Sequence, residues 1–197
     1  MGIVRGVKLG QIEPLIETVI ASGLKTLEIT MNTPGAGQLI LEANKISQNR
    51  LALGAGTVLD MDSLRLALDS GATFIVMPVL AKDVLAYCVK NKIPVFPGAL
   101  TPQEIYQAWE EGATMVKVFP AKFFGPEYFR EIKAPFNDIE LLACAGVTPQ
   151  NMAEYFAYGA SAIAFGGSVF RKDWLQKKDY SSIRCLIKAY LQKLPLK

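Results

Sequence analysis

The sequence predicts an α/β chain in which eight strand–helix units close into a (β/α)8, or TIM, barrel, as one domain over residues 1–197. Short apolar runs alternate strictly with longer amphipathic stretches, and glycines mark the ends of those stretches at a regular interval. An open doubly wound sheet uses the same alternation. The count of eight units favours the barrel, and no G-x-G-x-x-G of a dinucleotide-binding fold opens the first helix.

Each predicted strand is a brief apolar run bounded by glycine or proline, as buried parallel strands are. The eight runs are residues 2–5, 26–30, 51–56, 74–77, 95–97, 115–119, 141–144 and 162–165. Helices are expected at residues 12–21, 37–47, 61–68, 83–91, 102–110, 127–132, 149–158 and 183–193. Thr101 and Glu104 form a capping box at the start of the fifth helix. Glycines stand where helices should stop, at positions 23, 71, 112 and 159.

The composition excludes several classes of chemistry, because the chain contains no histidine. Ser-His-Asp and Cys-His catalysis, a histidine general base and histidine-bound zinc or iron are ruled out, and we expect neither a metal nor a cofactor. The acid–base groups that remain are carboxylates, lysine, tyrosine and cysteine. Three widely spaced cysteines, at positions 88, 144 and 185, fit a reducing cytoplasm better than a disulfide framework.

The charge and hydropathy patterns indicate a small-molecule partner. The net charge of +3 comes without a basic run, so nucleic acid is not an expected partner. No segment reaches the roughly 18 consecutive apolar residues that a membrane span needs. The mild positive charge would help to attract an anionic metabolite.

Three charged residues interrupt the predicted strands and should point into the barrel. Side chains alternate along a strand, and the outward ones pack beneath the helices. In Val116-Lys117-Val118 the valines suit the helix layer, so Lys117 points inward, and the same argument places Glu28 and Arg5 inside. Isolated buried charges are costly, so they are either paired or functional. A Glu28–Lys117 ion pair is the purely structural explanation, but buried pairs stabilise a fold poorly, so we favour function.

These three charges suit one kind of reaction. A desolvated lysine near another cation becomes a nucleophile toward carbonyl carbons. Its Schiff base with a 2-keto acid is an electron sink, and a neighbouring carboxylate can move protons at the carbon being made or broken. Lys117, Glu28 and Arg5 therefore predict a metal-free aldolase.

Glycine-rich loops after three predicted strands suit the anionic groups of such a substrate. Gly54-Ala55-Gly56-Thr57 follows the third strand, and Thr57 offers a hydroxyl and an N–H to a carboxylate. Loops after strands seven and eight are the usual phosphate site of barrels, and here they contain Gly146 and Gly166-Gly167-Ser168. Ordinary loop chemistry explains each loop alone, but together the last two fit a phosphate.

These segments occur in the order found in one enzyme family. The chain resembles the 2-keto-3-deoxy-6-phosphogluconate/4-hydroxy-2-oxoglutarate aldolases from Arg5 to the last helix, at Leu27-Glu28-Ile29-Thr30, Gly54-Ala55-Gly56-Thr57-Val58, Ile93-Pro94-Val95-Phe96-Pro97-Gly98, Val116-Lys117-Val118-Phe119-Pro120-Ala121 and Gly166-Gly167-Ser168. The resemblance implies a class I aldolase, usually a homotrimer. It would cleave 2-keto-3-deoxy-6-phosphogluconate or the phosphogalactonate to pyruvate and glyceraldehyde 3-phosphate, or 4-hydroxy-2-oxoglutarate to pyruvate and glyoxylate.

The resemblance also implies roles for individual residues. Lys117 matches the Schiff-base lysine and Glu28 the general acid/base. Thr57 matches a ligand of the pyruvate carboxylate, while Phe119 and Pro78 match the lining of the pocket. The residues that match the substrate phosphate site are Gly146, Gly166, Gly167 and Ser168.

The chain departs from the family pattern at four places. Asn32 stands where many members carry arginine. Branches that resemble 2-keto-3-deoxy-6-phosphogalactonate aldolase also have asparagine at this position, and Arg5 should then supply the guanidinium for the carboxylate. Cys144 stands where threonine is common; it should line the substrate site, and it puts the sugar stereospecificity in doubt. Ala145 replaces a glycine, and its Cβ should narrow the phosphate site. Members often begin with a helix before the first strand, which this sequence does not predict.

Two other functions remain open from the sequence. A phosphosugar epimerase or isomerase on the same barrel would use Glu28 without a covalent intermediate. A barrel that binds a phosphorylated metabolite without catalysis would fit the changes at Asn32, Cys144 and Ala145.

Overall fold

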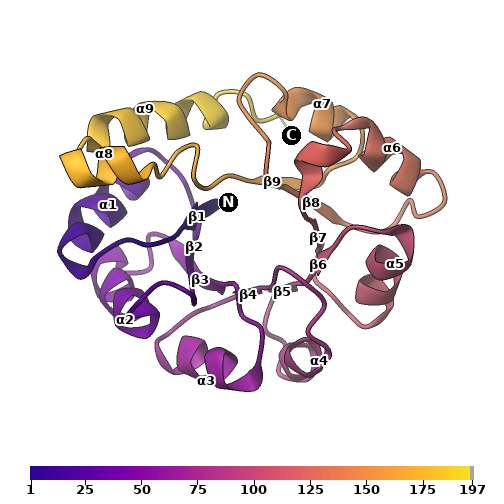
Figure 1. The fold of residues 1–197 in the computed structure, drawn as a ribbon, viewed down its shortest axis with the longest axis horizontal. Coiled ribbons are helices and arrows are strands. Elements are labelled where there is room, and N and C mark those ends of the chain that lie inside the picture. Colours follow the sequence, from indigo (N-terminus) through magenta and orange to yellow (C-terminus); the bar gives the residue numbers. More distant parts are fainter. Residues whose placement is uncertain (196–197) are drawn as a thin grey trace.

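The computed structural model describes residues 1–195 and has a ring of parallel strands enclosed by helices (Figure 1). The strands are β1 (Gly2–Val4), β2 (Thr26–Thr30), β3 (Ala52–Gly56), β4 (Ile75–Val76), β5 (Val95–Phe96), β6 (Gly98–Ala99), β7 (Val116–Val118), β8 (Leu141–Cys144) and β9 (Ala162–Ala164). The helices are α1 (Leu9–Ala21), α2 (Ala36–Ser47), α3 (Met61–Asp69), α4 (Lys82–Lys90), α5 (Pro102–Glu110), η1 (Ala121–Phe123), α6 (Glu127–Lys133), α7 (Met152–Ala157), α8 (Lys172–Lys177) and α9 (Tyr180–Leu191).

Strand pairing continues around the ring. β1 to β5 form one parallel ladder and β6 to β9 another, and Gly2 bridges Phe165 just after β9, which joins their outer ends. β5 and β6 are two halves of one strand, separated by Pro97, whose nitrogen cannot donate a ladder hydrogen bond. The Pro97 carbonyl accepts a hydrogen bond from the Lys117 N–H at 2.8 Å, so pairing with β7 spans the break. The barrel therefore has the eight strand positions that the sequence predicts.

Apolar side chains form two layers. The outer layer lies between strands and helices, and the inner layer fills the barrel interior. The outer layer includes Val4, Leu27, Ile29, Val116 and Val118, and the inner layer contains Leu142, Cys144 and Ala164. The predicted alternation along the strands is confirmed, because the outward residues belong to the layer beneath the helices.

The predicted helix ends are confirmed at several positions. The Glu104 carboxylate accepts from the Thr101 N–H at 2.8 Å, and the Thr101 hydroxyl accepts from the Glu104 N–H at 3.3 Å, which closes the capping box. The four glycines predicted to end helices have φ between +90° and +98°, the left-handed conformation of a residue just past a helix.

Two short helices, η1 and α8, were not predicted, and α1, α7 and α9 each start three residues away from the predicted position. α8 has six residues, too few for a helical apolar period to show. α1 begins at Leu9, because the Gln11 side chain accepts from the Lys8 N–H at 2.9 Å and caps the helix earlier. α7 begins at Met152, after Thr148 and Asn151 exchange hydrogen bonds at the turn before it. α9 begins at Tyr180, because the Asp179 carboxylate accepts from the Ser182 N–H at 3.1 Å and caps the helix earlier. No helix in the described part of the chain is long and apolar enough to cross a membrane.

Candidate active site

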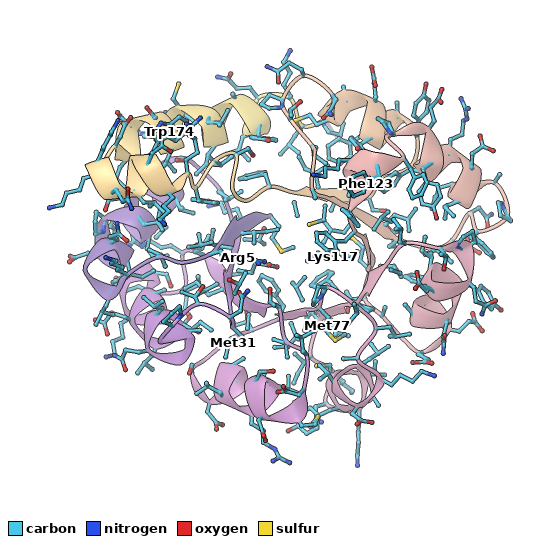
Figure 2. All side chains as sticks on the ribbon, in the orientation of Figure 1. Arg5, Met31, Met77, Lys117, Phe123 and Trp174 are labelled. Carbon is cyan, nitrogen blue, oxygen red and sulfur yellow. The ribbon has the colours of Figure 1, made fainter. Side chains whose placement is uncertain are left out.

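Lys117 lies in the middle of β7 and points into the barrel, as Figure 2 shows. Its neighbours Val116 and Val118 are fully buried under the helices, so the strand alternation sends the lysine to the other face. The side chain is 5% exposed, and its Nζ lies 5.2 Å from the centre of the Phe119 ring. The cation therefore sits on an aromatic face inside the barrel.

Glu28 on β2 is 1% exposed and occupies space that Gly56 leaves free. A Cβ atom at Gly56 would come within 2.2 Å of the Glu28 Oε1 atom. The Oε2 atom is buried and has no hydrogen-bond partner within residues 1–195. A buried carboxylate oxygen without a partner is costly, so this atom needs a functional explanation.

Burial raises the pKa of the Glu28 carboxyl above its usual value. The positive charge of Lys117 lowers this pKa, and the amino-terminal ammonium and Arg5 lower it by smaller amounts. Glu28 and Lys117 nevertheless form no ion pair, since the ion pairs found in the described residues all involve surface side chains. The ion-pair explanation of these two residues is therefore wrong.

Arg5 follows β1, is exposed to solvent, and extends toward the loop after β3, one strand beyond the neighbouring β2. Its Nη2 atom donates to the Thr57 hydroxyl at 3.4 Å, and its side chain points toward the barrel interior from the side opposite Lys117 (Figure 2). The Gly6 N–H donates to the buried Thr33 hydroxyl at 3.0 Å, which holds the backbone beside Arg5. A guanidinium and a hydroxyl at this rim suit a carboxylate.

A cavity of about 600 Å3 opens at the carboxyl ends of the strands. The predicted residues that line it are Arg5, Phe119, Cys144, Gly146, Gly166, Gly167 and Ser168. Lys117, Glu28 and Thr57 are not among the residues that line this cavity, but the lining residue Phe119 has its ring centre 5.2 Å from the Lys117 Nζ. Pro78 does not line the cavity; its carbonyl oxygen instead packs so closely on Gly98 that a Cβ there would lie 2.2 Å away.

The loop after β8 has an unusual backbone at the two positions next to Cys144. Ala145 and Gly146 have φ of +72° and +91°, a conformation that is strained for alanine. A Cβ at Gly146 would lie 2.3 Å from the Cβ of Lys122, so only glycine fits there.

Cys144 is buried, and burial raises the pKa of its thiol. Within residues 1–195, His, Cys, Asp and Glu side chains do not gather in groups that could hold a metal.

Two polar side chains that line the cavity, Thr148 and Lys172, were not among the site residues expected from the sequence. Thr148 follows Gly146, and Lys172 begins α8. Arg171, the neighbouring cation, pairs with Asp173 at 3.0 Å and is turned over Trp174, whereas Lys172 makes no ion pair among the described residues. Lys172 follows Ser168 closely in the sequence, and this position could have marked it as a site residue, because a lysine near a phosphate-binding loop can contact the phosphate.

The chain is similar to known proteins of one enzyme family. The family model for KDPG and KHG aldolase matches residues 1–186. The 2-dehydro-3-deoxy-6-phosphogalactonate aldolase of Escherichia coli (strain K12) is 30% identical over 191 residues, which cover 96% of this chain and 93% of that protein. The 2-dehydro-3-deoxy-phosphogluconate aldolase of Pseudomonas aeruginosa is 33% identical over 173 residues, covering 83% and 77%.

A solved structure described as native KDPGal has the same fold. It matches this chain with a TM-score of 0.90 at 28% identity, and the match covers 98% of this chain and 92% of that one. The predicted fold and family are confirmed. The chain belongs to the KDPG and KHG aldolase family and is an aldolase, a carbon–carbon lyase.

Proposed function

We propose that the chain cleaves a 2-keto-3-deoxy-6-phospho sugar acid (the gluconate or the galactonate), or 4-hydroxy-2-oxoglutarate, to pyruvate and an aldehyde through a Schiff base on Lys117. The proposal rests on one observation: Lys117 and Glu28 are both buried inside the barrel and form no ion pair with each other. Phe119, whose ring centre lies 5.2 Å from the Lys117 Nζ, lines a cavity that is also lined by the glycine-containing loops after β8 and β9. A buried amine and a buried acid that do not neutralise each other are available to a substrate.

The reaction begins when the Lys117 amine attacks the C2 carbonyl of the keto acid. Arg5 and Thr57 hold the carboxylate at the rim, which directs C2 toward the lysine. The carbinolamine loses water to give the imine, and Glu28 supplies the proton that the departing hydroxyl needs. The raised pKa of Glu28 supports this role, because a carboxyl that keeps its proton at higher pH can act as an acid.

Cleavage of the C3–C4 bond then sends its electron pair into the imine and leaves an enamine. The C4 hydroxyl loses its proton to the Glu28 carboxylate, directly or through a water, and C4 becomes the aldehyde carbon. The enamine takes a proton at C3 to restore the imine. Water adds to C2 and releases pyruvate and the free lysine amine, so atoms and charge balance over the cycle.

The far end of the substrate lies between the loops after β8 and β9. The backbone N–H groups around Gly146, Gly166 and Gly167 and the Ser168 hydroxyl bind the phosphate, and Lys172 supplies a positive charge. Cys144 lines the middle of the cavity, beside the substrate hydroxyls. The phosphogluconate and phosphogalactonate names both occur among the relatives.

We also propose that the protein is a homotrimer that works in the cytoplasm. Large apolar side chains are exposed on the segments that follow the carboxyl ends of β3, β4 and β7, at Leu59, Val79, Phe123 and Phe124. Apolar side chains gathered at one end of a barrel suit a subunit interface. Cys88, Cys144 and Cys185 form no disulfide, as is usual in a reducing compartment. Sedimentation equilibrium should give three times the chain mass of 21.5 kDa, and a monomer would refute the trimer.

Borohydride trapping with pyruvate tests the covalent step. Reduction should leave a pyruvyl group on Lys117, located by peptide mass spectrometry, and Lys117→Arg should give no adduct and no turnover. Lys122→Arg is the matched control, because Lys122 lies outside the strands and is exposed; it should label like the wild type. If folded wild-type protein gives no adduct, the Schiff-base mechanism fails. An epimerised product would then support the epimerase, and ligand binding without turnover would support the non-catalytic barrel.

A further inference from the structure

Tyr190, near the end of α9, contacts segments at the ends of two different strands. It is 2% exposed, and its hydroxyl donates to the Val147 carbonyl at 2.8 Å. Its ring stacks on Phe165, with 4.3 Å between the ring centres and 21° between the planes. α9 lies outside the ring of strands (Figure 1), and the Tyr190 side chain extends from it to both segments.

Each of the two contacts is next to a cavity-lining glycine. Val147 follows Gly146 in the loop after β8, and Phe165 precedes Gly166 in the loop after β9. The two strands pair as far as Cys144 and Ala164. Beyond that pair, no hydrogen bond joins residues 145–148 to residues 165–168 in the described chain. Tyr190 therefore contacts both loops, which within residues 1–195 share no hydrogen bond beyond the strand pair that ends at Cys144 and Ala164.

We infer that Tyr190 is a positioning residue that holds the loop after β8 in register with the loop after β9, so that both bind the same phosphate. The inference rests on the proposed function, because it assumes that these loops form the phosphate site. A phosphate oxygen is bound well only when its donors keep a fixed separation. Ala145 and Gly146 adopt left-handed conformations, and such conformations persist where surrounding contacts hold them. The bond to Val147 is one such contact.

The Tyr190 hydroxyl faces the Val147 carbonyl in one loop and the Ser168 side chain in the other, whereas its ring stacks on Phe165. Tyr190→Phe keeps the ring that stacks on Phe165 and removes the hydroxyl together with its contacts to Val147 and Ser168. Tyr155 supplies a matched control, because it is also buried and its ring packs against Phe129. Its hydroxyl forms no hydrogen bond to either loop within residues 1–195. Tyr155→Phe therefore makes the same chemical change away from the loops.

Kinetics with two substrates give the first test. Tyr190→Phe should raise KM for 2-keto-3-deoxy-6-phosphogluconate about fivefold, the equivalent of one neutral hydrogen bond, and leave kcat within about twofold. KM for 4-hydroxy-2-oxoglutarate, which has no phosphate, should not change. Tyr155→Phe should change neither. Equal KM changes for both substrates, or no change for either, would overturn the inference.

Amide hydrogen exchange gives a second test that does not depend on turnover. Peptides that cover residues 145–148 should exchange faster in Tyr190→Phe than in the wild type or Tyr155→Phe. Unchanged exchange at 145–148 would overturn the inference. If the wild type cleaves neither substrate, the proposed function fails, and the exchange measurement alone decides whether Tyr190 positions the loop.

Discussion

Replacing Glu28 with glutamine should remove a pH dependence from the stability of the protein. Burial raises the pKa of Glu28 in the folded state, whereas an unfolded glutamate titrates near its ordinary value of 4.5. Between these two values the folded protein binds one more proton than the unfolded chain, so the free energy of unfolding falls as pH rises. The contribution of Glu28 is fully present below pH 4.5 and is lost as pH rises through the folded pKa. The glutamine side chain does not titrate in this pH range, so the variant lacks this pH-dependent contribution to the free energy of unfolding.

The size of the effect follows from one proton. A difference of one bound proton changes the free energy of unfolding by about 1.4 kcal/mol for each pH unit. From pH 4.5 upward, the wild type should lose stability relative to Glu28→Gln at about that slope. The difference should become constant once pH exceeds the folded pKa, since Glu28 is then ionised in both states.

Urea unfolding of the wild type and Glu28→Gln from about pH 4 to 8, at one protein concentration, measures this difference directly. Glu13→Gln is the matched control, because it removes a carboxylate from an exposed site on α1. Its difference from the wild type should stay nearly constant over the same range. A constant difference for Glu28→Gln as well would show that the carboxylate is not destabilised in the folded protein, and the reasoning from burial would be refuted.

Two further substitutions test the space and the charge around the site. Gly56→Ala should lower kcat about a hundredfold, because its Cβ would lie 2.2 Å from the Glu28 Oε1 atom and displace the carboxylate. Gly10→Ala is the control, because a Cβ there meets no atom within 4 Å, and it should leave kcat unchanged. An unchanged kcat in Gly56→Ala would show that the position of Glu28 does not matter. Lys172→Met should raise KM for the phosphorylated substrate about tenfold, the loss of one charged contact, without affecting 4-hydroxy-2-oxoglutarate. Lys177→Met, at the other end of α8, should affect neither substrate, and similar KM changes in both variants would argue against a direct phosphate contact.

Much of the fold could be predicted because its signals are local. The direction of a strand side chain depends only on its place in the alternation, so Val116 and Val118 predict the inward position of Lys117. The capping box at Thr101 and the glycines that end helices depend on residues a few positions apart. These features need no knowledge of distant contacts, and the structure confirms them.

The sequence by itself therefore determined the barrel, the inward positions of Glu28 and Lys117, and the loops after β8 and β9 that line the cavity. Only the tertiary structure decided how residues from different strands and helices meet. It placed Glu28 beside Gly56 without an ion pair to Lys117, turned Lys172 toward the cavity, and brought Tyr190 to Val147. The reason is physical: periodicity sets which way a side chain points, whereas distances across a barrel depend on strand stagger, loop shape and packing, which no local pattern encodes.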